Sequence, residues 1–241
     1  MTPLELVQIT SPQINGAGAA FYFDPATLAH GKELGLDGFR FYVLGRGGVL
    51  GDVESPVVAS AFGYFGPGVV EAIWTSAKER VAPRDAAREY LQCAEEFGRV
   101  RLAGVGGLDA FNESAESVTA AVDVASLALF AGLVAEPLPD DAASRAYRNV
   151  VALRELRGSI HLLAVVASNL RPSVAHAIKR PDDIASFGWD PAPEITDADR
   201  SAAVAAERLT DQLMVQWFEH LDDAAADALA DGAAAIAAAL T

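Results

Sequence analysis

Residues 83–97, PRDAAREYLQCAEEF, give the clearest indication of the fold. Their apolar side chains recur at intervals of three and four residues, at Ala87, Tyr90, Leu91, Ala94 and Phe97. This spacing places them on one face of an α-helix, whereas a half-buried strand would alternate at every second residue. A proline at the first position suits a helix start. The stretch therefore predicts an amphipathic helix.

Similar helix signals extend outward from this stretch in both directions. Further helices are predicted over Pro25–Leu34, Asp37–Leu44, Ser55–Phe62, Gly66–Glu79, Asn112–Leu133, Ala142–Arg157, His161–Leu170, Thr196–Leu221 and Asp222–Leu240. The stretch Ser11–Ala20 contains proline and glycine and is expected to be a loop, and Asp37–Leu44 is the most strand-like segment. The sequence contains no strand pair, hairpin dipeptide or repeat. We therefore expect an all-α, multi-helical fold.

The sequence Glu136-Pro-Leu-Pro-Asp140 is the best candidate for a domain boundary. It divides the chain into an N-terminal helical segment, 1–138, and a C-terminal helical segment, 139–241. At 241 residues, the chain is long enough for two small domains or one larger one. We expect two helical halves packed together, either as separate domains or as one compact unit.

The chain is strongly acidic, with a formal net charge of −15. From Asp190 to Thr241 there are two basic and eleven acidic residues, so this segment carries nine of the fifteen excess negative charges. A field of this sign repels nucleic acid and anionic lipid. The charge therefore argues against DNA binding and against a membrane partner.

The cellular environment is indicated by the cysteine content and the N-terminus. Cys93 is the only cysteine, so no internal disulfide is possible, which fits a reducing compartment. Residues 1–5 lack the basic region and apolar core of a signal peptide. We expect a cytoplasmic protein in which Cys93 is a small buried side chain rather than a reactive thiol.

Two features are candidates for chemistry. The glycine-rich stretch Gly45–Gly51 contains Arg46, which would hold an anion, but a tight helix connection explains the glycines equally well. In a continuous helix, Arg154, Arg157 and His161 would share one face. Two guanidinium groups beside an imidazole suit an anionic ligand and would keep the histidine neutral. The alternative is a pair of arginines bonded to carboxylates, with His161 satisfied in the core.

The remaining histidines indicate no metal site. His30, His176 and His220 do not have the spacing of metal ligands with each other or with His161. His176 and His220 are expected to be solvated, and the sequence implies no particular cofactor.

Several motifs spread over most of the chain resemble those of a known family. They are Leu34–Phe39 (LGLDGF), Gly45–Gly51 (GRGGVLG), Phe62–Trp74, Leu153–His161 (LRELRGSIH), Phe187–Trp189 (FGW) and Leu209–Leu213 (LTDQL). As a set they resemble proteins of high-GC bacteria catalogued as helix-turn-helix proteins. The resemblance implies a protein of transcriptional-regulator type.

The C-terminal half departs from the pattern of that family. In typical members the tryptophan at the position of Trp189 is followed by a helix, a recognition-type helix, a glycine-rich wing and a closing helix. Here Trp189 is followed by Asp-Pro-Ala-Pro-Glu-Ile-Thr and then directly by a long helix. This implies a degenerate helix-turn-helix in which the wing is truncated.

Three functions are compatible with these observations. The first is a small-molecule-binding protein of regulator type, with a ligand between the halves near Arg46, Arg154, Arg157 and His161. The second is an enzyme that uses His161 as acid or base, with Arg154 or Arg157 holding an anionic substrate. The third is a structural or partner-binding protein that forms a homodimer through its alanine-rich C-terminal helices.

Overall fold

A computed structural model describes residues 1–241, and it confirms that the protein is all-α and multi-helical. The N-terminal part contains α1 Pro3–Ala17, α2 Pro25–Glu33, α3 Gly38–Gly47, α4 Ser55–Phe62, α5 Pro67–Lys78, α6 Pro83–Arg101, α7 Leu108–Ala120 and α8 Ala128–Val134. The C-terminal part contains α9 Ala142–Ala167, α10 Pro172–Lys179, α11 Asp197–Val215 and α12 Asp223–Ala239. Two short 3-10 turns, η1 Gly48–Leu50 and η2 Pro181–Asp183, complete the secondary structure.

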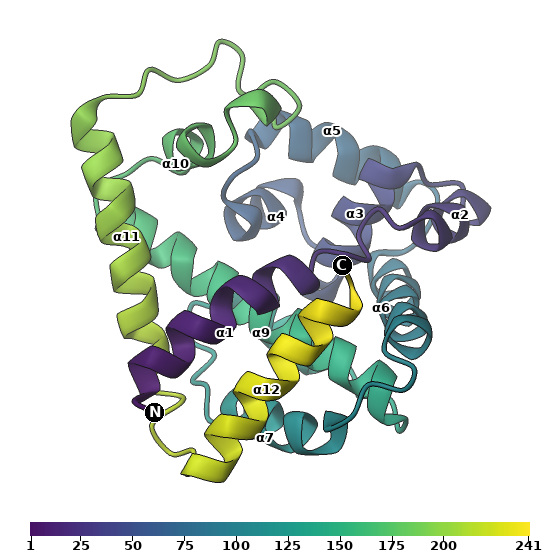
Figure 1. The fold of residues 1–241 in the computed structure, drawn as a ribbon. Coiled ribbons are helices and arrows are strands. Elements are labelled where there is room, and N and C mark those ends of the chain that lie inside the picture. Colours follow the sequence, from purple (N-terminus) through teal and green to yellow (C-terminus); the bar gives the residue numbers. More distant parts are fainter.

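Helix α9 is the central element of the fold. It contacts α1, α6, α7, α8, α10 and α11, and Figure 1 shows it running behind α1 and α12. Asp141 caps its N-terminus by accepting a hydrogen bond of 3.0 Å from the backbone N–H of Ser144. Because neighbours surround α9, polar side chains on it are buried as well as apolar ones, including Arg148, Asn149 and Glu155.

One hydrophobic core of 48 buried residues extends through both segments of the chain. Its members come from α1, from α3 to α9, from the end of α11 and from α12, which packs across α1 and α7. A second cluster, of five residues, joins α9, α10 and α11. The predicted boundary stretch around residue 138 lies between α8 and α9. The same core contains residues from both sides of this stretch.

Helix α6 confirms the sequence prediction and contacts α3 at short range. Tyr90, Leu91 and the other predicted face residues of α6 belong to the core or pack against it. A Cβ atom added at Gly45 would lie 2.5 Å from Cβ of Tyr90, and one at Gly48 would lie 2.0 Å from the carbonyl oxygen of Pro83. The glycine-rich stretch therefore allows close contact between α3 and α6, as the helix-connection interpretation proposed, although the helix itself continues to Gly47.

Three predictions of helix boundaries were wrong. The stretch from Ser11 to Ala17 is helical, because Pro12 is accommodated inside α1. The predicted helix through Leu133 is divided into α7 and α8 by a connection in which Ser126 has a positive φ of 67°. The predicted break between Arg157 and His161 is absent, since α9 continues through Gly158. By contrast, the strand-like segment Asp37–Leu44 is helical, as predicted.

None of the helices combines the length and the apolar character that a bilayer-spanning segment requires.

Candidate functional site

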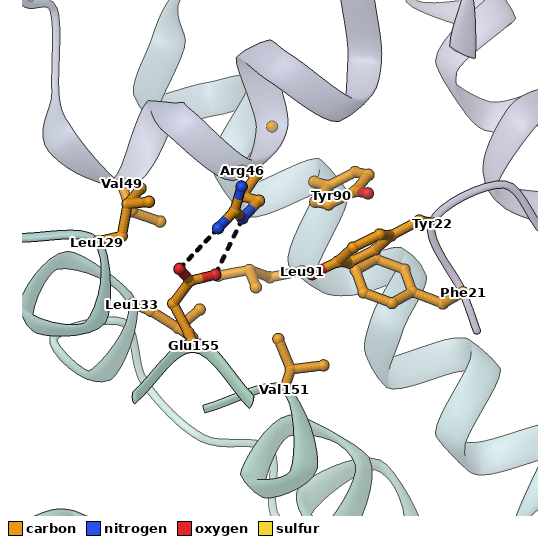
Figure 2. Close-up of a pocket in the computed structure, with 11 residues that line it drawn as sticks. Phe21, Tyr22, Arg46, Val49, Tyr90, Leu91, Leu129, Leu133, Val151 and Glu155 are labelled. Atoms are coloured by element: carbon orange, nitrogen blue, oxygen red, sulfur yellow. Dashed lines mark hydrogen bonds and ion pairs between the residues drawn. The ribbon is translucent and has the colours of Figure 1, made fainter. Parts of the chain in front are cut away.

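The first polar centre is formed by Arg46 in the last turn of α3 and Glu155 in the middle of α9. Figure 2 shows the two side chains facing each other, with Arg46 Nε and Nη2 donating hydrogen bonds of 2.9 and 2.8 Å to the two carboxylate oxygens. Arg46 Nη1 donates a third bond, of 3.1 Å, to the hydroxyl of Tyr42, one helical turn earlier. The guanidinium carbon lies 4.5 Å from the ring centroid of Phe62. The pair is therefore bidentate and enclosed by aromatic rings.

Arg154 brings a second guanidinium group to the same centre. Its Nη1 donates a hydrogen bond of 2.7 Å to the hydroxyl of Tyr22, and its Nε donates one of 3.3 Å to the carbonyl oxygen of Asn15. Arg154 is largely buried and forms no ion pair, because the only nearby carboxylate, Glu155, is bonded to Arg46. The centre thus holds two guanidinium groups and one carboxylate, which leaves one positive charge without a partner.

Three tyrosine hydroxyls complete this centre, which we call the arginine cage and define as Tyr22, Tyr42, Arg46, Tyr90, Arg154 and Glu155. The hydroxyls of Tyr22 and Tyr42 accept hydrogen bonds from the arginines and donate none within the protein. Tyr90 is 2% exposed, and its hydroxyl has no hydrogen-bond partner. The cage therefore has an excess of hydrogen-bond donors as well as an excess of positive charge.

The ionisation states of the cage follow from burial and charge. Burial raises the pKa of Tyr22 to about 12 and raises that of Tyr90 well above its ordinary value, so both phenols stay protonated and can donate. Burial alone would raise the pKa of Glu155, but the charge and hydrogen bonds of Arg46, together with the charge of Arg154, outweigh it and lower that pKa. Glu155 is therefore ionised, and the cage as a whole carries one net positive charge.

A small cavity opens beside the cage. Phe21, Val49, Leu129 and Leu133 are among its apolar walls, and Arg46, Glu155 and Tyr90 also line it (Figure 2). Its volume, counted as the space in which the centre of a water molecule can move, is about 20 Å³. One water molecule needs roughly 10–15 Å³ on this measure, so the cavity accepts one or a few small atoms.

Arg157 and His161 belong to a second centre, farther along α9 and facing α11. Arg157 Nη2 donates hydrogen bonds of 2.9 Å to Glu207 and 3.2 Å to Asp211. His161 Nδ1 lies 2.9 Å from Oγ1 of Thr210. The ring of Tyr64 stacks on His161 with a centroid separation of 6.4 Å.

The hydrogen bonds of Thr210 decide the tautomer of His161. The Thr210 hydroxyl donates its only proton to the carbonyl oxygen of Ala206, at 2.7 Å. The contact with His161 Nδ1 therefore requires a proton on Nδ1, which the Thr210 oxygen accepts. Nε2 is left as an unprotonated acceptor. The nearest carboxylate oxygen, on Glu207, is 3.8 Å from Nε2, which is longer than a hydrogen bond.

The electrostatic surroundings keep His161 neutral. Its pKa is lowered, firstly by burial and then by the charges of Arg157 and Lys179, while Glu207 acts in the opposite direction. The neighbouring arginines in the sequence predict a lowered pKa for His161, and in the structure burial is the larger cause. The imidazole faces a surface groove between α9, α10 and α11.

The sequence prediction grouped residues that the structure divides between two centres. Arg46 and Arg154 lie together in the arginine cage, whereas Arg157 and His161 lie together at α11. His176 was expected to be solvated, but it is 7% exposed and its ring stacks on Phe187 at 4.0 Å, so that expectation was wrong. His220 is exposed, as predicted.

Sequence reasoning missed the tyrosines, Thr210 and the role of Glu155. The one available signal was the position of Tyr42, four residues before Arg46 in a predicted helix, which places both on one face. Tyr22 lies in the connection between α1 and α2, and Tyr90 lies in α6. Nothing in the local sequence of either residue connects it with Arg154.

The fold and these two centres define an all-helical protein with an internal cationic cage. A family model described as "Helix-turn-helix family" matches residues 10–241, which is nearly the whole chain. The chain belongs to this helix-turn-helix family. No curated protein and no solved structure matches it.

Proposed function

We propose that the protein is a small-molecule-binding protein of transcriptional-regulator type and that its ligand is a small anion bound in the arginine cage. The observation that carries this proposal is the presence of two largely enclosed guanidinium groups beside one buried carboxylate. A buried charge without a partner costs several kcal/mol, and an anionic ligand would remove that cost. The unpartnered hydroxyl of Tyr90, which lines the cavity, supplies a hydrogen bond to it, and the charge of Arg154 attracts it from behind the cavity wall.

The size and walls of the cavity indicate the kind of anion. The lining combines the polar groups of Arg46, Tyr90 and Glu155 with apolar side chains that include Leu129 and Leu133. A small carboxylate with a short hydrocarbon group matches this arrangement, because its charged end and its apolar end would each meet a matching surface. The cavity of about 20 Å³ holds little more than one water-sized group, so even a small carboxylate binds only if the surrounding side chains and helices move apart.

The regulator assignment follows from family membership and from the end of α9. Helices α9 and α10 are joined by the four residues Ser168–Arg171, a connection of the length found in helix-turn-helix units. The segment from Asp190 to Thr241 carries nine of the fifteen excess negative charges, which opposes contact with phosphates. We therefore propose that ligand binding is retained and that DNA binding by this chain is degenerate or absent. An electrophoretic shift at about 50 mM salt tests this part, since non-specific binding is strongest at low salt.

The ligand proposal can be tested by anion-specific stabilisation. The protein is melted in sodium acetate, propionate or phosphate at fixed ionic strength, with a large organic anion as the reference. A bound anion at about 100 times its Kd raises stability by about 2.7 kcal/mol. Native mass spectrometry of the freshly purified protein reports a retained ligand and the number of subunits, for which we expect a homodimer.

Two variants identify the site. Arg154→Met removes the unpaired charge and Tyr90→Phe removes the unpartnered hydroxyl, so both should abolish the anion-specific part of the stabilisation. Arg99→Met is the matched control, because Arg99 is exposed and pairs only with Glu96 on its own helix. Equal stabilisation by all anions, or the same response in Arg154→Met and the wild type, would refute the proposal.

A further inference from the structure

The groove beside His161 is separate from the arginine cage and has three properties of a binding site: its size with apolar walls, a hydrogen-bond acceptor on His161, and positive charges at its rim. It has a volume of about 370 Å³. Its walls are apolar side chains from three helices, namely Val165, Leu170, Ala175, Ile178, Ala203, Val204 and Ala206. Its polar lining consists of His161, Lys179, Arg200 and Glu207. This volume is within the range of small-molecule sites.

His161 presents a hydrogen-bond acceptor to this groove. Because Thr210 fixes the proton on Nδ1, the lone pair of Nε2 is free, and no donor lies within hydrogen-bond distance of it. The side chain is 16% exposed, and it reaches solvent through the groove. An acceptor held in this way is satisfied by a ligand that carries an O–H or N–H group.

The charges at the rim of the groove are mostly positive. Lys179 Nζ lies 3.4 Å from the Glu207 oxygen that also faces His161 Nε2. Arg157 pairs with Asp211 at 3.2 Å as well as with Glu207 at 2.9 Å, so these two carboxylates balance the charges of Arg157 and Lys179. Arg200 makes no ion pair and is exposed at the same rim. An anionic group on the ligand would therefore be attracted to the rim.

From these three properties we infer that the groove is a second binding site, separate from the arginine cage, and that it takes an apolar acid carrying a hydroxyl group. The hydroxyl donates to His161 Nε2, the hydrocarbon part lies against Val165, Leu170 and Val204, and the acid group faces Lys179 and Arg200. The site lies between the helices α9, α10 and α11, so a ligand there contacts all three elements around the helix-turn-helix connection.

The probe for this inference is 4-hydroxybenzoate, and benzoate is its matched control without the hydroxyl. Titrations of the full chain are followed by NMR, with the ¹⁵N signals of the histidine rings as the direct readout. Before addition, the spectrum should show His161 protonated at Nδ1 and not at Nε2. We expect 4-hydroxybenzoate to shift the His161 Nε2 signal and to bind about three- to tenfold more tightly than benzoate, the range that one hydrogen bond provides.

Variants separate this site from the cage. His161→Phe keeps an aromatic ring against Tyr64 and should reduce the preference for 4-hydroxybenzoate over benzoate to none. Lys179→Met should weaken both probes, while His220→Phe, on a different surface, and Arg154→Met, in the cage, should change neither affinity. The inference is overturned if both probes bind wild-type protein equally, if the preference survives in His161→Phe, or if Arg154→Met abolishes binding.

Discussion

The charge imbalance in the arginine cage predicts an unequal response to two substitutions. Glu155→Gln preserves the size of a side chain that is 5% exposed, but it removes the only negative charge and raises the net charge of the cage from one to two. Breaking a buried ion pair by removing one partner costs about 3–5 kcal/mol. Arg154→Met removes the guanidinium group that has no ion pair, so the loss of its two hydrogen bonds, at about 0.5–1.5 kcal/mol each, is offset by the relief of an unpaired buried charge.

We therefore expect Glu155→Gln to lower the free energy of unfolding by about 3–5 kcal/mol and Arg154→Met by about 0–2 kcal/mol. Urea unfolding measures both values, with the fluorescence of the buried Trp74 and Trp217 as the signal. The measurement is made in a buffer without small carboxylates, so that no ligand neutralises the cage. If Arg154→Met lowered the free energy of unfolding as much as Glu155→Gln does, the charge of Arg154 would have to be balanced by a group outside the cage, and the reasoning from an unpaired charge would be refuted.

Other predictions concern pH, packing and thiol reactivity. Burial lowers the pKa of His161 and of His176, so the folded state favours their neutral forms. The stability that this provides should be fully present above about pH 6.5 and should be lost as the pH falls below that value. His161→Gln should reduce this pH dependence of the unfolding free energy, measured by urea titrations at several pH values. A slope that is unchanged in His161→Gln would contradict this assignment. Gly48→Ala should cost about 1–3 kcal/mol through overpacking, because its Cβ would lie 2.0 Å from a backbone carbonyl oxygen, whereas Gly158→Ala, with no atom within 4 Å, should stabilise α9 by about 1 kcal/mol. Thermal melts of the two variants check this. Equal changes in melting temperature for Gly48→Ala and Gly158→Ala would be inconsistent with the close contact between the glycine-rich stretch and α6. Burial raises the pKa of Cys93 to about 12, so at pH 8 it should react with a disulfide reagent far more slowly than a free thiol does, and a rate equal to that of free cysteine would rule out this environment.

The candidate site could be predicted only in part. The sequence singled out Arg46, Arg154, Arg157 and His161 and predicted that the last three would share one face if the helix were continuous. The helix is continuous, but Arg154 lies in the arginine cage while Arg157 and His161 contact α11. The sequence did not show that Glu155, a neighbour of Arg154 in sequence, is bonded to Arg46 instead. Adjacent residues on a helix point about 100° apart, so the partner of each depends on which helix packs against that direction.

The sequence by itself determined the class of fold, because hydrophobic spacing and capping residues act within a few neighbours along the chain. It also determined the charge balance, since net charge depends only on composition. The tertiary structure decided which polar groups meet. Arg46 and Glu155 are 109 residues apart, and Arg154 and Tyr22 are 132 apart, so these contacts form only after α3, α9 and the connection between α1 and α2 have packed together. The unpaired positive charge of the cage exists for the same reason, because packing encloses two arginines with a single carboxylate and excludes the water that would otherwise solvate them.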